Sequence, residues 1–242
     1  VAEKTIFEYA DIKGEALAVP VSNINPYLVD APDLVLEKRN QPICIVPTIS
    51  YGSMANDDGH LLLDKEQRNA LIAAEPATAP YIRRYMGAQE FLNNAERWCL
   101  WLKDISPSLM RSSNELRHRI EAVRKFRASS NREATRNLAA TPSLFGEDRQ
   151  PLKSYLLLPK VSSENRPYMP IGFMPSEVIA NGSALTISDS GHYEMGVLQS
   201  KMHMAWMRAV AGRMKSDYQY SAQIVYNNFP WPDLPEKLEP NQ

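Results

Sequence analysis

The sequence predicts an α+β fold, in which a mixed or antiparallel sheet packs against helices and follows an extended N-terminal arm. Apolar residues recur at the three- and four-residue spacing of amphipathic helices in two long segments, 108–129 and 193–213. Elsewhere they gather in short runs between turn residues, which is typical of strands. This combination places the chain in the α+β class. The predicted strands of the domain cover residues 97–102, 154–161, 168–174, 183–189 and 218–226.

The first 50 residues are predicted to form the extended arm. Prolines occur throughout this segment, and each one disfavours a helix. Three short runs within it, TIFEY, LVLEK and ICIVP, have the composition of strands. We expect the rest of the chain to divide into a domain over residues 51–232 and a proline-rich tail over residues 233–242.

Capping residues mark the starts of two predicted helices. Asp64 directly precedes a helical segment, and Gln67 lies three positions after Asp64, which is the pattern of a capping box. This helix is predicted to end near Ala74. Ser106 is the predicted N-cap of the long helix in the middle of the chain. A further short helix is predicted over residues 81–86.

The composition is that of an ordinary globular protein, with 44% hydrophobic residues to build a core. No apolar run approaches the roughly 20 residues that cross a bilayer, and the first residues lack the basic and apolar regions of a signal peptide. The two cysteines, Cys44 and Cys99, are too few for a disulfide framework, which fits a reducing compartment. We therefore expect a cytoplasmic protein without a membrane partner.

Positive charge is concentrated in one segment of a chain whose net charge is −1. Residues 111–136 contain eight basic and three acidic side chains, so this segment carries +5 and the rest of the chain −6. Such asymmetry can mark a surface that faces phosphate groups. A solvated helix face with partial ion pairing would give the same pattern, and both interpretations stay open. The apolar side of this helix is predicted to contain Leu109, Leu116, Ile120, Val123 and Phe126.

The sequence lacks the motifs of the common catalytic and metal sites. Its four histidines have neither cysteine partners nor each other at a metal-binding spacing. No glycine-rich loop joins a strand to a helix, so a dinucleotide fingerprint is missing. No serine lies in a nucleophile elbow. His203 lies in an apolar helical segment, where a packed core histidine is the simpler interpretation. We expect no metal ion and no cofactor in this chain.

Two segments of the arm are superficially similar to catalytic motifs. Asn25-Pro26-Tyr27 is similar to the Asn-Pro-Pro-Tyr loop with which amino-methyltransferases hold a flipped base. One proline is missing here, and only 24 residues precede the motif, so a turn in the arm is the preferred interpretation. Asp33, Glu37 and Lys38 do not match a nuclease site either, because adjacent residues of a strand point to opposite faces.

A binding surface remains, and the junction between the last predicted helix and strand offers one. Lys215 can donate hydrogen bonds to guanine O6 and N7, and Asp217 can accept one from cytosine N4. Two residues apart on a turn or strand, these side chains could read both members of one G·C pair. An ordinary surface lysine beside an aspartate that ends the helix is the alternative interpretation.

Five long segments of the chain match, in the same order, segments of a known protein family. They are NINPYLVDAP, ERWCLWL, ATRNLAATPSLFGEDRQP, YLLLPKVSSENRPYMPIGF and VLQSKMHMAWMRAVAGRMKSDYQYSAQIVYNNFPWP, and they span about residues 23–232. The chain thereby resembles the YeeA-like or MmeI-like DNA methyltransferases, which are single-chain type IIL restriction–modification enzymes. Long collinear segments are far more specific than a short motif.

The resemblance implies that the chain is a target recognition domain, which follows the methyltransferase core in these enzymes. The core contains the S-adenosylmethionine site and the Asn-Pro-Pro-Tyr loop, and nuclease members carry a further domain before it. Family enzymes modify adenine at N6, and the recognition domain holds double-stranded DNA and reads its bases. The chain would then act in cis with its methyltransferase core, and alone it would bind no cofactor and have no methyltransferase activity.

The resemblance also implies roles for particular residues. The segment GRMKSDYQYS matches the family segment in which two positions vary with the last recognised base pair, and these positions are Lys215 and Asp217 here. Two neighbouring segments supply candidates for other base pairs, which are Lys160, Ser162, Glu164, Asn181 and Ser183. The predicted phosphate contacts are Arg111, Arg117, Arg124, Lys125 and Arg213.

Two other functions stay open at this point. The chain could complete part of the methyltransferase active site, with its arm packed on the core. It could instead be a scaffold that packs the core and contacts DNA little. The segment VYNNFPWP is compatible with a scaffold, because Phe229 and Trp231 beside prolines can anchor a partner surface. Salt-dependent binding to duplex DNA would separate recognition from scaffolding, and binding of S-adenosylmethionine by this chain would favour the enzyme.

Overall fold

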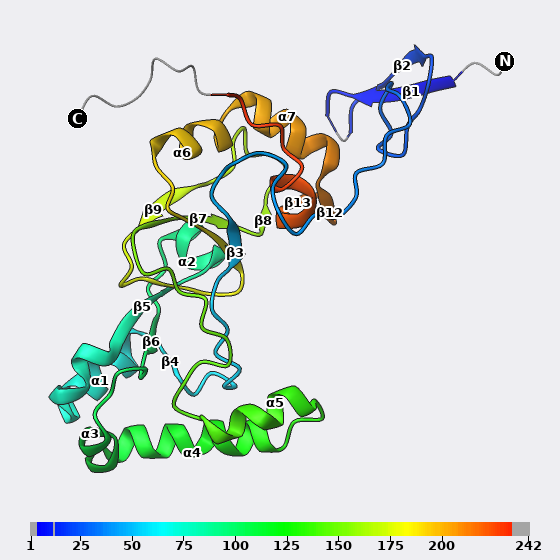
Figure 1. Cartoon of the computed structure of the whole chain (residues 1–242). Coiled ribbons are helices and arrows are strands. Elements are labelled where there is room, and N and C mark those ends of the chain that lie inside the picture. The colour runs from blue at the N-terminus through cyan, green and yellow to red at the C-terminus, as the bar shows by residue number, and fades with distance from the viewer. Residues whose placement is uncertain (1–3, 12, 234–242) are drawn as a thin grey trace, which may run out of the picture.

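The chain folds into an elongated molecule with a central sheet, a helical region at one end and a separate hairpin near its N-terminus (Figure 1). The computed structural model describes residues 4–11 and 13–233. Nearly all of the predicted tail over residues 233–242 lies outside these ranges. Strand pairing among the described residues is antiparallel except between β10 and β5. Helices combined with mainly antiparallel sheets confirm the predicted α+β class.

The central sheet has the strand order β3-β11-β7-β9. Its strand β7, with the sequence YLLLP, is buried throughout because both faces of the strand are covered. Leu156 and Leu158 belong to the largest core, together with Met204 and Met207 of the helix α7, whereas Leu157 belongs to a smaller cluster on the other side. The strands cover Ile49–Tyr51 (β3), Ala184–Ser188 (β11), Tyr155–Pro159 (β7) and Gly172–Met174 (β9).

Two helices pack on the central sheet where the sequence predicted a single helix over 193–213. They are α6 (His192–Leu198) and α7 (Lys201–Val210). Ser200 separates them, because its hydroxyl accepts a hydrogen bond from the His203 N–H (3.1 Å) and thereby caps α7.

The second four-stranded sheet, in the order β10-β5-β6-β4, lies toward the helical end of the molecule (Figure 1). Cys99 and Leu100 pack there against Leu116 and Val123 of α4. No helix in the described part of the chain has the length and apolar character needed to cross a membrane. The elements are β4 (Leu62–Leu63), β5 (Ile82–Met86), β6 (Trp98–Leu100), β10 (Ile179–Ala180), α1 (Lys65–Ala74), α2 (Ala88–Asn93), α3 (Pro107–Ser112), α4 (Asn114–Ala128) and α5 (Glu133–Asn137), with 3₁₀ turns at Pro76–Tyr81 and Leu138–Ala140.

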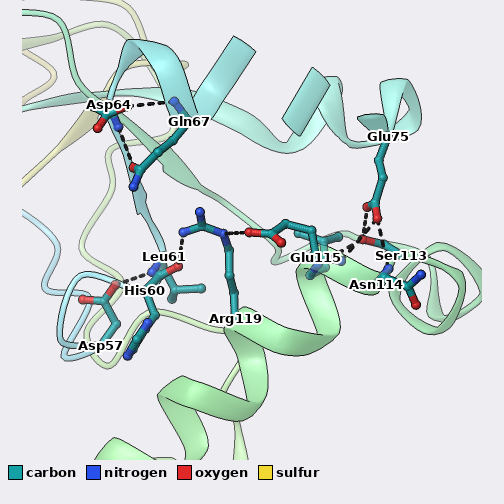
Figure 2. Close-up of polar contacts among 11 residues, drawn as sticks. Asp57, His60, Leu61, Asp64, Gln67, Glu75, Ser113, Asn114, Glu115 and Arg119 are labelled. Carbon is teal, nitrogen blue, oxygen red and sulfur yellow. Dashed lines mark hydrogen bonds and ion pairs between the residues drawn. The ribbon is translucent and has the colours of Figure 1, made fainter. Parts of the chain in front are cut away.

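The prediction of a helix over residues 81–86 is wrong, because Ile82–Met86 form the strand β5. Pro76 and Pro80 lie in a 3₁₀ turn that ends at Tyr81, and Ile82 then pairs with Leu100 of β6. A pairing between distant segments thus overrides the local preference. The capping box at Asp64 and Gln67 is confirmed, with hydrogen bonds of 2.7 and 3.1 Å between them (Figure 2).

The segments LVLEK and ICIVP of the arm were predicted as strands, and this is also wrong. Their backbone instead binds a distant segment near the C-terminal end. The Ile43 N–H donates to the Asn227 carbonyl (2.9 Å), and the Asn228 side chain donates to the Glu37 carbonyl (3.1 Å). Side-chain amides thus satisfy an irregular backbone that prolines keep out of a regular ladder.

All five predicted strands of the domain are shorter in the structure than in the prediction, and for two of them a local cause is clear. The strand predicted over 218–226 is confirmed only as β13 (Asp217–Gln219), because Ser221 caps a π-helical turn over Ala222–Tyr226. The strand predicted over 168–174 is reduced to β9. Pro170 precedes β9 and has no N–H to donate to a ladder.

An N-terminal hairpin stands apart from the body of the molecule (Figure 1). The predicted strand TIFEY is confirmed as β1 (Lys4–Tyr9), and its partner β2 (Ala16–Val21) was not predicted. Pro20 lies within β2, opposite Thr5. Proline is tolerated at the edge of so small a sheet, which is why composition concealed this strand.

The long helix predicted over 108–129 is divided by Ser113. Glu75, at the end of α1, accepts hydrogen bonds from the Ser113 hydroxyl, the Asn114 N–H (3.0 Å) and the Glu115 N–H (3.2 Å), as Figure 2 shows. Burial would raise the pKa of the Glu75 carboxyl, but these hydrogen bonds lower it overall. A carboxylate from another helix therefore caps the start of α4, where the helix dipole favours negative charge.

Arg127, near the end of α4, is completely buried and fastens the helix to two loops. Its guanidinium donates to five backbone carbonyls at 2.7–3.0 Å. These five hydrogen bonds use all five N–H donors of the buried guanidinium, which compensates for the loss of water around its charge. The acceptors are the carbonyls of Ala55, Asn56, Leu138, Thr141 and Leu144.

We expect Arg127→Met to lower the free energy of unfolding by about 3 kcal/mol or more, because buried carbonyls lose their donors. Urea unfolding of the 242-residue chain measures this change. Arg124→Met is the matched control, since Arg124 is exposed on the same helix and should change stability by less than about 0.5 kcal/mol. Equal effects of the two substitutions would contradict the structural role of Arg127.

Candidate functional site

The backbone of Lys160 joins the central sheet to a small three-stranded sheet, whose order is β12-β13-β8. After β7 the chain bends at Lys160 and continues as β8 (Val161–Ser162). The Lys160 N–H donates to the Ser183 carbonyl (3.1 Å), and the Lys160 carbonyl accepts from the Tyr220 N–H (2.7 Å). One residue therefore holds the turn before β11 and the end of β13 on its two sides.

The turn at residues 181–183 is stabilised by its own side chains. Asn181 Oδ1 accepts hydrogen bonds from the Ser183 N–H (2.8 Å) and the Ser183 hydroxyl (2.6 Å). Ser183 Oγ in turn accepts from the Ala88 N–H (2.9 Å) at the start of α2. The Asn181 amide lies so close to Gly87 that a Cβ there would come within 2.1 Å of it, so only glycine fits. Ser183 is exposed on a rigid turn, and Asn181 is half-buried.

The strands β12 (Gly212–Met214) and β13 form a hairpin with a two-residue turn, which we call the recognition hairpin (residues 212–219). Met214 pairs with Asp217, so Lys215 and Ser216 form the turn. Lys215 is exposed at the tip and has a φ of 58°, a conformation that favours glycine. An L-residue in this conformation costs about 1 kcal/mol or more. Five other non-glycine residues in the described part of the chain share a positive φ, so the conformation alone assigns no function to Lys215.

The Lys160 side chain lies over an exposed aromatic ring. Its Nζ is 4.9 Å from the centroid of the Tyr51 ring, and the Arg149 guanidinium carbon is 6.0 Å from the same ring. Tyr51 ends β3 and remains 41% exposed. Sequence reasoning did not identify Tyr51 as part of the site, because its position beside Lys160 depends on the pairing of β3 with β11.

Three predicted contact residues are engaged or buried within the small sheet. Arg213 Nη1 donates to the Ser216 carbonyl (2.9 Å) and lies 3.9 Å from Glu164 Oε2, so these two predicted contacts face each other. Ser162 pairs with Tyr218 and is only 3% exposed. Its hydroxyl therefore does not reach the surface of this structure, and we leave Ser162 out of the proposed contact set.

A buried histidine contacts Tyr220, the residue whose N–H binds the Lys160 carbonyl. His203 of α7 is completely buried, and its Nε2 lies 3.0 Å from the Tyr220 hydroxyl. The Phe229 ring packs edge-on against the imidazole at 4.5 Å. Burial lowers the pKa of His203 to about 4, so the ring is neutral near pH 7. The interpretation of His203 as a packed core residue is confirmed.

The four predicted phosphate contacts of the basic segment lie far from the recognition hairpin. Arg111 is in α3, and Arg117, Arg124 and Lys125 are in α4, at the opposite end of the molecule in Figure 1. All four side chains are exposed. Arg124 Nε also lies 3.6 Å from Glu121 Oε2, and an exposed ion pair of this kind contributes little to the free energy of unfolding.

Other charges of the basic segment hold the fold together. Arg119 binds Glu115 (2.7 Å) and the His60 carbonyl (3.0 Å), as Figure 2 shows, and Arg127 is the buried residue described above. Partial pairing, the alternative left open by the sequence, is thus correct for this side of the helix. Phe126, predicted on the apolar side of α4, is exposed instead.

The segments considered as catalytic or anchoring motifs have structural roles. Asn25 is buried, and its Oδ1 accepts from the Tyr27 N–H (2.9 Å) and the Val29 N–H (3.2 Å), which makes a turn in the arm. Phe229 and Trp231 are buried in the main core and present no anchor at the surface. In the described ranges, no three ligating side chains gather closely enough to hold a metal ion.

These features define a polar candidate site built on a hairpin with a left-handed turn residue and on a turn fixed by its own side chains, with a separate basic helix. Comparison with known proteins identifies its class. The chain belongs to the family of MmeI target recognition domains, whose model matches residues 30–233. That match includes the recognition hairpin, the turn at residues 181–183 and the basic helix.

Two relatives share most of this chain but are much longer. DNA methyltransferase A of Bacillus subtilis (strain 168) is 38% identical over 214 residues, which are 88% of this chain and 24% of that protein. The solved structure of the type IIL restriction–modification enzyme MmeI in complex with DNA matches with a TM-score of 0.92 and 44% identity, over 98% of this chain and 32% of that one. The chain therefore spans about a quarter of the first relative and about a third of the second.

The pKa of His203 predicts that stability falls as the pH is lowered from 6.5 to about 4. In this window the unfolded chain binds a proton that the folded chain excludes, so acid favours unfolding. A shift of this size corresponds to roughly 3 kcal/mol at its limit. Urea unfolding at several pH values, compared between the wild type and His203→Gln, measures it. The variant should lose stability near pH 7 and show a flatter pH dependence; an unchanged pH dependence would contradict the assignment.

Proposed function

We propose that this chain recognises a specific sequence in double-stranded DNA, as the target recognition domain of a DNA adenine-N6 methyltransferase of the type IIL restriction–modification class. One observation carries the proposal. Three segments that the sequence marked separately are joined in the structure through Lys160. Its backbone binds Ser183 and Tyr220, and the strand that follows it pairs with β13 of the recognition hairpin, which contains Lys215 and Asp217. Membership of the family and the DNA complex of a relative support the same function.

The recognition hairpin is the element that we assign to base reading. A two-stranded ribbon fits the major groove, where each base pair presents its own pattern of donors and acceptors. The Lys215 amine donates to guanine from the tip of the hairpin, and the Asp217 carboxylate accepts from the paired cytosine. Lys160 binds Tyr220 next to the end of the hairpin that lies away from the tip, and Ser183 binds Lys160 on its other side. We assign Lys160, Asn181 and Ser183 to other base pairs of the site.

The basic helix α4 is the element that we assign to phosphate contacts. Arg117, Arg124 and Lys125 are exposed on it, and Arg111 precedes it. Phosphate contacts position a protein on the duplex, whereas base contacts specify the sequence. Because α4 and the hairpin lie at opposite ends of the molecule, mutations should separate the two effects.

The two alternative functions have less support. Phe229 and Trp231 were the reason to consider a scaffold, and they are used in the chain's own core. Asn25, considered for an active site, is used in a turn. We infer that S-adenosylmethionine binds to the methyltransferase core of the longer protein, in the bacterial cytoplasm, and that this chain alone is not an enzyme.

We expect that calorimetric titration of the 242-residue chain with S-adenosylmethionine shows no binding. The chain has no glycine-rich cofactor loop, and Asn25 is not free to hold a base. A full-length relative with its methyltransferase core is the positive control. A micromolar dissociation constant for the chain alone would instead favour the enzymatic alternative.

The main test of the function is duplex binding at different salt concentrations. The chain should bind duplex DNA with an affinity that falls as salt rises, because phosphate contacts release counterions. Replacement of Arg117, Arg124 and Lys125 by Ala should reduce the log–log salt slope by up to about 0.9 per lost contact, and by similar amounts for all duplex sequences.

The matched control for this experiment is the triple substitution of Lys65, Lys103 and Lys153 by Ala, which removes the same charge from other exposed positions. Its slope should remain close to that of the wild type. If both triple variants lost the same slope, or if neither lost any, α4 would not be the phosphate surface.

Specificity is tested by exchanging donor and acceptor along the hairpin, in the double variant Lys215→Glu and Asp217→Arg. Lysine has no acceptor and an ionised aspartate has no donor, so neither can do the task of the other. One position of the motif methylated by the full-length enzyme should change from G·C to C·G, while the others stay fixed. A bidentate contact discriminates by about 1–3 kcal/mol, which is large enough to see.

The exposed pair Lys153 and Asp189 provides a matched control, because it has the same residue types 3.7 Å apart away from the hairpin. Lys153→Glu combined with Asp189→Arg should leave the methylated motif unchanged. An unchanged motif and normal activity in the hairpin variant would mean that Lys215 and Asp217 are ordinary surface residues.

A further inference from the structure

Three groups surround the Arg213 side chain, namely the Tyr218 ring, the Ser216 carbonyl and the Glu164 carboxylate. Its guanidinium carbon lies 3.9 Å from the centroid of the Tyr218 ring, directly across the ladder, since Arg213 and Tyr218 are register partners. Its Nη1 donates to the Ser216 carbonyl (2.9 Å) and lies 3.9 Å from Glu164 Oε2. The ring, the turn and the segment after β8 therefore all fix one side chain.

The hydrogen bond to the Ser216 carbonyl acts on the peptide between Ser216 and Asp217, where the turn enters β13. It therefore limits rotation of the backbone directly before Asp217, and it fixes the second residue of the turn that Lys215 begins. The turn itself is unfavourable, because Lys215 has a φ of 58°. The hydrogen bond from Arg213 to the Ser216 carbonyl offsets part of this conformational cost. Arginine suits this position, because its planar group can stack on a ring and donate a hydrogen bond at once.

Glu164 links Arg213 to another segment of the candidate site. It lies after β8, whose first residue follows Lys160, and its side chain is 33% exposed. The contact between Glu164 and Arg213 connects the segment of Lys160 with the recognition hairpin. A change at residue 164 is thus transmitted to the turn of the hairpin through one guanidinium.

We propose that Arg213 is a positioning residue, which holds the Lys215–Asp217 turn in its base-reading conformation, and that Glu164 sets how firmly it does so. Discrimination at the base pair read by Lys215 and Asp217 then depends on residue 164, which does not itself read that pair. This inference rests on the proposed function, and it replaces the predicted phosphate contact of Arg213 and the predicted base contact of Glu164.

A phosphate contact and a positioning role have different signatures. Loss of a phosphate contact weakens binding to every duplex and reduces the salt slope by about 0.9. Loss of positioning reduces discrimination at one base pair and leaves the other positions unchanged. Arg213→Lys retains the charge but loses the planar fork, and Glu164→Gln retains the size but loses the charge, so both variants test positioning.

The experiment selects duplexes from a random pool with the 242-residue chain and then measures affinities for the preferred duplex and its single-pair variants. The base pair read by the hairpin is the one whose preference is lost in Lys215→Ala. At this pair, Arg213→Lys should reduce the discrimination ratio by about tenfold. Glu164→Gln should reduce it by a smaller factor of about two to five, because a partly exposed ion pair contributes little. Arg208→Lys is the control, since Arg208 is exposed on the neighbouring helix α7. Thermal unfolding confirms that each variant folds.

Three results would overturn the inference. The discrimination ratio could stay unchanged in both variants, the affinity could fall equally for all duplexes, or all positions of the motif could weaken together. If the wild-type chain enriched no motif at all, the proposed function would fail before any variant was compared. The two failures are therefore distinguishable.

Discussion

The two backbone hydrogen bonds of Lys160 are the constraint on which the recognition surface depends. Its N–H binds the carbonyl of Ser183 and its carbonyl binds the N–H of Tyr220, so the turn and the hairpin cannot move independently. Tyr220 is supported in turn by the neutral, buried His203. Exposed side chains are thereby held on rigid elements, which base reading requires because hydrogen bonds depend steeply on geometry.

Arginine is used in three different ways in this chain, and burial and partners separate them. Arg127 is buried and binds only carbonyls, so it stabilises the fold. Arg213 is bracketed by an aromatic ring, a carbonyl and a carboxylate, and it positions a turn. Arg117 and Arg124 remain exposed on α4 and are available to phosphate groups. The number of basic residues in the basic segment is therefore larger than the number that can contact a ligand.

Local signals predicted part of the fold and part of the site. Asp64 and Gln67 located a helix start, and the apolar run of β7 located the central strand, because both depend on neighbouring residues. The strand β5 was mistaken for a helix, and the proximity of Tyr51 to Lys160 was missed, because both depend on pairing between distant segments. The candidate contact segments came from a family resemblance, and only the structure showed that the Lys160 backbone joins them and that Ser162 is buried.

We propose that Lys160 and Lys215 belong to one DNA-facing surface. Amine labelling with an acetylating reagent, read by mass spectrometry with and without a duplex selected by the chain, measures whether DNA covers these two side chains. We expect the duplex to protect both lysines over the same concentration range and to leave the exposed Lys153 reactive. Protection of Lys153 with continued reactivity of Lys160 and Lys215 would contradict it.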